Sequence, residues 1–212
     1  MKAPFILFDF DGTIADSIHY ALDIVNAFAP EYGIEPLNEE QFEMVRSMHM
    51  HKAMKILKFP VYKLPGAVTR VLLEYRKKVH ELQPYDGVRE MLTELKEMGC
   101  KMAVLSSNTK ENLDYFINHH ELHYFDWAEG TSGTLNKQKR IKAQMKNHGI
   151  DKDQIIYVGD EIRDISAAKK SGIRVIAVTW GFHTSDLLVR KDPDYLVSHP
   201  SEIVEIVKSI LA

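Results

Sequence analysis

Two carboxylates stand two residues apart near the start of the chain. The segment from residue 8 to 17 reads FDFDGTIADS, so that Asp9 and Asp11 directly follow an apolar run. Carboxylates that share a pocket repel one another unless a cation binds between them or one of them keeps its proton. Mg²⁺ prefers such oxygen ligands, and a carboxylate beside a bound phosphate can attack phosphorus to give an aspartyl phosphate. The pair therefore predicts phosphoryl chemistry, with Asp9 as the nucleophile and Asp11 as the general acid and base.

Further polar residues stand after later apolar runs or at the start of a helical pattern, where this chemistry would need them. They are two hydroxyls, one amide, one lysine and two more acids: Ser106, Ser107, Asn108, Lys137, Asp160 and Asp164. Hydroxyl, ammonium and backbone N–H groups, including the N–H of Gly12, can bind phosphate oxygens. Asp160 and Asp164 alone would indicate helix capping, but together with the first two acids they predict a Mg²⁺ site.

The elements that would hold these residues alternate along the chain. Short apolar runs typical of buried strands cover residues 5–8, 102–105, 155–158, 175–178 and 195–197. Helical patterns cover residues 88–98, 109–119, 137–148 and 162–171. Strands that alternate with helices predict an α/β fold, a three-layer, doubly wound parallel sheet of the Rossmann type. Ligands bind such sheets at the carboxyl ends of the strands.

One region breaks the alternation. From about residue 18 to 83 the sequence shows helical patterns and no convincing strand. A capping box is predicted at Asn38, three residues before Gln41. Pro65 suits the first turn of a long amphipathic helix. A helical insert that begins just after the two acids would stand over the strand ends like a lid.

These patterns predict two domains. We expect a small all-α cap at residues 17–83, inserted after the first strand, and an α/β core made of residues 1–16 and 84–212. Within the cap, Arg46 and Lys52 are candidates for binding a substrate anion. By default both are ordinary surface charges, and only their place in the cap favours a binding role.

Together the motifs resemble those of the haloacid dehalogenase superfamily. The first motif is similar to DFDGT at residues 9–13, the second to VLS at 104–106, the third to Lys137, and the fourth to VGDEIRD at 158–164. They occur in the family's order, and the resemblance covers essentially the whole chain. The helical insert is similar to the small cap of the phosphoglycolate phosphatase-like branch. The resemblance implies a Mg²⁺-dependent phosphatase that hydrolyses a small phosphomonoester metabolite through an aspartyl phosphate.

The resemblance also implies roles for the acids. Asp9 matches the family's nucleophile and a metal ligand. Asp11 matches the acid and base, with its backbone carbonyl as a second ligand. Asp160 matches the third ligand of the metal, and Asp164 a residue that supports the metal site.

Roles for the other polar residues follow in the same way. Ser106, with Ser107 beside it, and Lys137 match the phosphate binders, although Lys139 lies two residues further on and is an alternative for the lysine. Asn108 stands where relatives often contact the substrate or its phosphate.

Other functions of the same fold remain open. Mutases of the β-phosphoglucomutase type carry a cap histidine twelve residues after the nucleophile, and here that position is Ala21. A dehalogenase would use a lone aspartate, which the presence of Asp11 disfavours. A binding protein that keeps the fold without turnover is the alternative from another class. The stretch 45–52 lacks the Gly-Leu-Pro sequence of glycolate-phosphate relatives, so the metabolite is not identified.

Composition narrows the partners. The 212 residues carry a formal net charge of −3 without a long basic stretch, which disfavours nucleic acid and anionic membranes as partners. The single cysteine, Cys100, and the absence of a signal-like or membrane-spanning run predict a cytoplasmic protein. We expect a monomer or weak homodimer.

The histidines at 49 and 51 and at 119–123 are interpreted as surface or capping groups rather than a zinc site.

Overall fold

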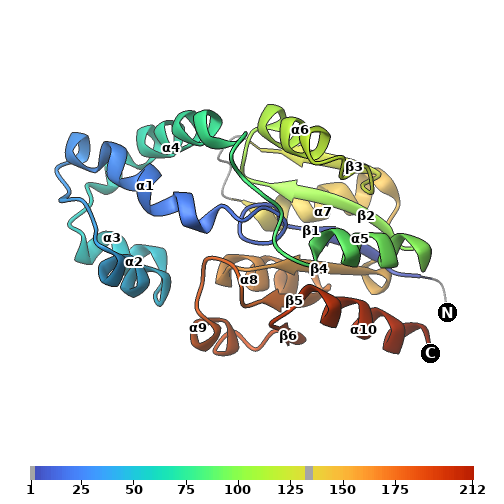
Figure 1. Ribbon diagram of the computed structural model, residues 1–212. Helices are drawn as coiled ribbons and strands as arrows, with labels where there is room; N and C mark the ends of the chain where they lie inside the picture. Colours follow the sequence, from blue (N-terminus) through green and yellow to red (C-terminus); the bar gives the residue numbers. More distant parts are fainter. Residues whose placement is uncertain (1–2, 132–135) are drawn as a thin grey trace.

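The computed structural model describes residues 3–131 and 136–212. Within these ranges, parallel strands form one sheet in the order β3-β2-β1-β4-β5-β6. The bounds of the strands are β1 (Phe5–Phe8), β2 (Lys101–Ser106), β3 (Trp127–Gly130), β4 (Ile155–Gly159), β5 (Arg174–Val178) and β6 (Tyr195–Val197). β1 lies at the centre of the sheet, between β2 and β4, so the strand that leads into Asp9 and Asp11 is buried on both sides (Figure 1).

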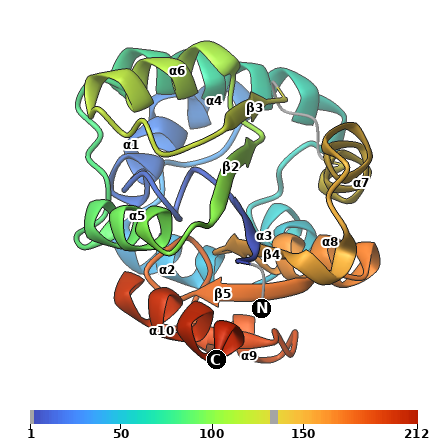
Figure 2. The same ribbon diagram turned by 90° about the vertical axis from the view of Figure 1, so that its right-hand side faces the viewer.

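Helices cover both faces of the sheet. On one face β1 and β2 pack against α5 (Val88–Glu97), α6 (Lys110–His119) and α10 (Pro200–Leu211) through one apolar cluster. On the other face a second cluster joins the sheet to α7 (Lys137–His148), α8 (Ile162–Ser171) and α9 (Ser185–Val189). Figure 2 shows α5 and α10 on one side of the sheet and α7 and α8 on the other. The predicted three-layer α/β fold is confirmed.

The apolar strands explain this layering. All four residues of β1 are buried, and alternate ones, such as Ile6 and Leu7, belong to opposite clusters. Side chains of successive strand residues point to opposite faces, so a strand without polar residues needs cover on both. One strand was not predicted. Residues of β3, with the sequence WAEG, are only half-buried at the sheet edge, and so carry no continuous apolar run.

Between β1 and α5 the regular elements of the described chain are all helical. They are α1 (Ile18–Phe28), α2 (Glu39–Arg46), α3 (Met50–Ile56) and α4 (Leu64–Lys78), with short 3₁₀ turns at Ala29–Tyr32 and Val61–Lys63. A third 3₁₀ turn, Lys152–Gln154, precedes β4. The predicted capping box is present, because Asn38 and Gln41 exchange side-chain and backbone hydrogen bonds of 2.9 Å. Pro65 lies in the first turn of α4, as predicted.

The helices α1–α4 gather beyond the end of the sheet to which β1 leads (Figure 1). Two connections join them to the sheet and run side by side. The N–H of Asp16 donates to the carbonyl of Gln83 at 2.8 Å, and the N–H of Tyr85 donates to the carbonyl of Ile14 at 3.0 Å. Both chain crossings therefore lie next to the residues that follow β1. None of the described helices is long and apolar enough to cross a membrane.

Candidate active site

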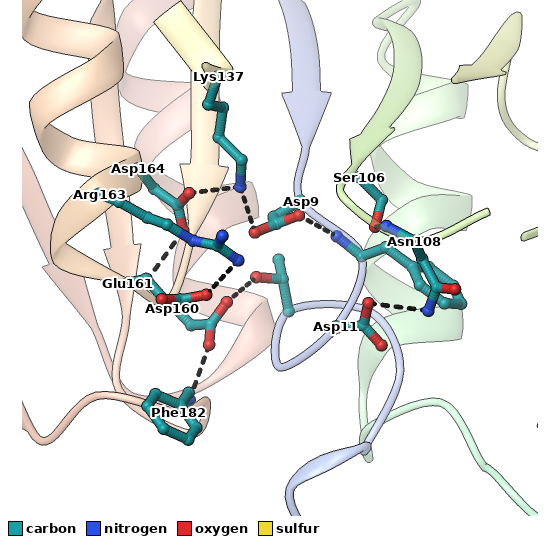
Figure 3. Close-up of polar contacts among 12 residues, drawn as sticks. Asp9, Asp11, Ser106, Asn108, Lys137, Asp160, Glu161, Arg163, Asp164 and Phe182 are labelled. Carbon is teal, nitrogen blue, oxygen red and sulfur yellow. Dashed lines mark hydrogen bonds and ion pairs between the residues drawn. The ribbon is translucent and has the colours of Figure 1, made fainter. Parts of the chain in front are cut away.

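Residues far apart in the sequence meet where the parallel strands end. Asp9 follows β1, Ser106 ends β2, Asp160 follows β4, and Lys137 opens α7. Figure 3 shows their side chains directed toward one another. All four are at least nine-tenths buried. Charged and polar groups at this depth are stable only when they are paired or hydrogen-bonded.

Lys137 bridges two of the acids. Its Nζ lies 2.5 Å from Asp9 Oδ2 and 2.5 Å from Asp164 Oδ1 (Figure 3). The other oxygen of Asp164 accepts the N–H of Glu161 at 2.9 Å and so caps α8. Lys139, the alternative lysine, has an exposed side chain. The geometry therefore favours Lys137 as the lysine of the site.

Burial and the neighbouring charges shift the pKa values of both Asp9 and Lys137. Burial raises the pKa of Asp9 to about 7, although the nearby Lys137 opposes the shift. Burial alone would lower the pKa of Lys137, but Asp164 and Asp9 raise it well above its ordinary value. The lysine therefore keeps its charge, and the excess of acids around it leaves room for another cation.

Asp160 is held by the loops that follow β1 and β5. The hydroxyl of Thr13 donates to Oδ1 at 2.8 Å, and the N–H of Phe182 donates to Oδ2 at 2.7 Å (Figure 3). A Cβ on Gly12, where φ is +74°, would lie 2.2 Å from Oδ2, and a Cβ on Gly181 would lie 2.1 Å from the Cβ of Asp160. Glycine is therefore required at both positions for the loops to close around the carboxylate.

The acids fit a hard divalent cation. One carboxylate oxygen from each of Asp9, Asp160 and Asp164 lies within 4.8 Å of the others, and all three residues are buried. Burial, and then the charges of Glu161 and Asp164, raise the pKa of Asp160 well above its ordinary value, as expected for closely spaced buried acids. Oxygen ligands of this kind, too few to fill a coordination sphere, suit Mg²⁺ with its retained waters. The carboxylate of Asp11 is not part of this group.

Asp11 lies instead beside Asn108. The amide nitrogen of Asn108 donates to Asp11 Oδ2 at 3.1 Å. The amide oxygen of Asn108 accepts from Thr109 N at 2.8 Å and from Asn112 Nδ2 at 2.7 Å, which fixes its orientation. Burial raises the pKa of Asp11, with Tyr75 and Asn108 as opposing hydrogen-bond partners. A carboxyl group with a raised pKa, apart from the metal cluster, is suited to carry a proton.

Three of the four predicted phosphate binders line one small cavity, whereas Gly12 lines a different one together with Asp11. Ser106, Ser107 and Lys137 share the wall of a space of about 10 Å³, together with Arg163. The hydroxyl of Ser106 accepts the N–H of Asn108 at 3.0 Å, so its own hydrogen remains available as a donor. These donors are the kind that bind phosphate oxygens.

Sequence reasoning gave no role to Arg163 or Glu161. Nη2 of Arg163 lies 2.5 Å from Glu161 Oε1, and its guanidinium is directed toward the acid cluster (Figure 3). Both residues lie within the fourth motif, but only the acid spacing of that motif was used. The sequence did contain a signal for Arg163, because this cationic residue stands between the closely spaced acids Glu161 and Asp164.

The two cap residues predicted to bind substrate lie elsewhere. Arg46 donates from Nε to the carbonyl of Phe182 at 2.7 Å and from Nη2 to the carbonyl of Gly181 at 2.9 Å, and it also pairs with Glu43. Its guanidinium thus contacts the loop after β5. Lys52 is exposed on α3. Neither residue is among the described residues that line the cavity beside Asp11.

The comparisons with known proteins agree with this geometry. The family of haloacid dehalogenase-like hydrolases matches residues 6–178. A phosphoglycolate phosphatase from Synechococcus elongatus is 30% identical over 207 residues, which cover 97% of this chain and 98% of that protein. An N-acetylmuramic acid 6-phosphate phosphatase from Pseudomonas aeruginosa is 24% identical, with 100% and 97% covered.

Solved structures show the same fold. A haloacid dehalogenase-like family hydrolase from Streptococcus pneumoniae superposes with a TM-score of 0.82 at 23% identity, over 96% of this chain and 98% of that one.

Proposed function

The chain belongs to the haloacid dehalogenase-like hydrolases, and from this premise we propose that it is a Mg²⁺-dependent phosphatase of a small phosphomonoester. The observation that carries the proposal is the separation of the site into two parts. Asp9, Asp160 and Asp164 form a buried group of acids, whereas Asp11 lies apart from it beside Asn108. A nucleophile in a metal site and a separate proton carrier are what two-step phosphoryl transfer needs.

The metal would be held by Asp9, Asp160 and Asp164, with the backbone carbonyl of Asp11 as a further ligand. When bound, Mg²⁺ would neutralise the acids and the charge of the phosphate. Ser106, Ser107 and Lys137 would bind the remaining phosphate oxygens. Lys137 already holds Asp9 by its Oδ2, which orients the carboxylate.

The reaction would run in two steps. An oxygen of Asp9 attacks phosphorus, the bond between phosphorus and the ester oxygen breaks, and Asp11 gives its proton to that oxygen. Asp11 then takes a proton from water, whose oxygen attacks the phospho-Asp9. Inorganic phosphate leaves and the carboxylate of Asp9 is restored. The raised pKa of Asp11 suits a group that must alternate between both forms.

The substrate would be small. We propose that residues 17–83 act as a cap that limits access to the strand ends, because α1–α4 lie over that edge of the sheet. The relatives named above act, by their names, on phosphoglycolate and on N-acetylmuramic acid 6-phosphate. Both are small organic phosphates, which supports a small phosphorylated metabolite as the substrate class.

A colorimetric assay tests the proposal. We expect the protein to hydrolyse an aryl phosphate in the presence of Mg²⁺ and to lose this activity with excess chelator. The matched variant is Asp9→Asn, which should abolish turnover while circular dichroism shows a retained fold. Asp11→Asn should lower the rate about 10²–10⁴-fold, as is typical of lost general acid–base catalysis. Equal turnover in Asp9→Asn would exclude the covalent mechanism, and no turnover in the wild type would favour a binding protein.

A further inference from the structure

Two cavities in the described part of the chain lie where the cap helices meet the sheet edge. The larger has a volume of about 810 Å³ and is lined by residues of α3, α7 and α8. Its wall carries one acid, Glu161, and the basic groups His49, His51, Lys137, Arg163, Lys170 and His183. The smaller has a volume of about 220 Å³ and lies between α1, α4 and the loops after β1 and β2. A phosphate ester has an alcohol part, and the cavity that holds this part determines which substrates the site accepts.

The position of Asp11 indicates which cavity holds the alcohol part. A general acid must lie within hydrogen-bond reach of the oxygen that it protonates. The ester oxygen, and with it the alcohol part of the substrate, must therefore lie beside Asp11. Asp11, Ser107 and Asn108 line the smaller cavity and not the larger one. We therefore assign the smaller cavity to the alcohol.

The cap side of this cavity is apolar. The side chains that line it from α1 and α4 are mainly Ile18, Ala21, Ile24, Val25, Val71 and Leu72. The polar groups on that side are Ser17 and the hydroxyl of Tyr75. Burial raises the pKa of Tyr75 well above its ordinary value, and the charge of Asp11 adds to the shift. The phenol therefore stays neutral.

The charged residues around the cavity are all acids. They are Asp11, Asp160 and Glu161, and the described residues that line it include no Lys, Arg or His. A carboxylate or second phosphate placed there would lose its water without gaining a cationic side chain from the described residues of the wall.

We propose that the alcohol released by this phosphatase is small, uncharged and largely apolar. The inference rests on the proposed function, since it takes Asp11 as the acid. A volume of about 220 Å³ is below the roughly 300–1,000 Å³ of common ligand pockets, which favours an alcohol of a few carbon atoms. Glycolate, the product implied by the name of the Synechococcus relative, carries a carboxylate that the cavity walls do not match.

A pair of esters of equal size tests this. Isobutyl phosphate has two methyl groups where phosphoglycolate has two carboxylate oxygens. Each ester is added as a competitor to Mg²⁺-dependent hydrolysis of an aryl phosphate, so that an inhibition constant is obtained whether or not the ester turns over. In the wild type we expect isobutyl phosphate to bind at least about tenfold more tightly than phosphoglycolate, which corresponds to about 1.4 kcal/mol.

A positive charge placed in the wall of the smaller cavity tests whether the alcohol part of the substrate lies against that wall. Leu72→Lys puts an ammonium group into the cavity and should shift the ratio of the two constants at least about tenfold toward phosphoglycolate. Leu73→Lys is the matched control, because Leu73 follows on the same helix and is 51% exposed. It should leave the ratio unchanged. If Leu72→Lys fails to fold, Val71→Lys tests the same wall.

The outcomes separate the two proposals. Hydrolysis of the aryl phosphate together with tighter binding of phosphoglycolate in the wild type would overturn the inference and leave the phosphatase in place. Equal ratios in Leu72→Lys, Leu73→Lys and the wild type would also overturn it, because the alcohol would then not lie against this wall. Absence of Mg²⁺-dependent hydrolysis in the wild type would remove the proposed function itself.

Discussion

The guanidinium of Arg46, at the end of α2, donates a hydrogen bond of 2.7 Å to the carbonyl of Phe182, in the loop after β5. This contact joins a cap helix to the loop whose N–H binds Asp160. The aromatic rings of Phe42 and Phe182 meet edge to face beside it, with centroids 6.1 Å apart. One loop thus contacts both the cap and the carboxylate of Asp160. Arg46 accordingly connects the cap to the core, and the anion-binding role expected for it stays a prediction.

Replacing Arg46 should weaken catalysis without regard to substrate. Arg46→Ala removes charge-assisted hydrogen bonds, each worth about 1.5–3 kcal/mol, and so should weaken the contact that holds the cap against the loop after β5. We expect kcat/KM to fall about tenfold or more for an aryl phosphate and for the best metabolite alike. Arg190→Ala, at an exposed position, is the control. A loss confined to the metabolite would return Arg46 to substrate recognition.

Lys137 should stabilise the metal-free fold as well as bind phosphate. Lys137→Met leaves the buried carboxylates of Asp9 and Asp164 without their shared cation. Breaking such a buried pair costs about 3–5 kcal/mol. In excess chelator we expect Lys137→Met to have a lower melting temperature than the wild type. In excess Mg²⁺ we expect the melting temperature of the variant to recover in part. Lys139→Met removes an exposed lysine of the same helix and should leave the melting temperature unchanged, both in chelator and in Mg²⁺. Equal melting temperatures for Lys137→Met and the wild type would contradict the bridge.

Several of the site residues that the sequence predicted follow strands directly. Asp9 stands one residue beyond β1, and Ser106 is the last residue of β2. Because parallel strands end at one edge, the sheet pattern alone brings such residues together. The edge strand β3 escaped prediction for the opposite reason. Its residues are half-buried, and it is held by pairing with β2 rather than by an apolar pattern of its own.

The contact between the cap and the core was not predicted from the sequence. Arg46 and Phe182 are 136 residues apart, and no local pattern indicates that an exposed-looking arginine will meet a backbone carbonyl. The same holds for the cavity beside Asp11, since α1 and α4 each appear only as amphipathic helices. Which apolar side chains remain facing a cavity depends on how the helices pack over the sheet.

Mg²⁺ affinity should depend on pH near neutrality. In the metal-free site burial raises the pKa of Asp9 to about 7. Below that pH the carboxyl group keeps its proton, and the proton competes with the metal. Lowering the pH from 8 to 6 at constant ionic strength should therefore weaken Mg²⁺ binding, by about tenfold for each pH unit below 7 if one proton is displaced. Isothermal titration calorimetry would measure this, and constant affinity over the range would argue against a protonated Asp9.

Thr13 should tune the metal site without touching the metal. Its hydroxyl is buried and donates to Asp160 Oδ1 at 2.8 Å. Thr13→Val keeps the shape of the side chain but leaves that carboxylate oxygen without its donor, so its orientation is less fixed. Loss of such supporting contacts typically weakens metal binding about 10–100-fold. We expect a corresponding rise in the Mg²⁺ concentration needed for half-maximal activity, with a smaller change in kcat at saturating metal. Thr13→Ser retains the hydroxyl and should stay within about threefold of the wild type on the same scale. If both variants required the same Mg²⁺ concentration as the wild type, the hydrogen bond would have no part in holding Asp160 for the metal.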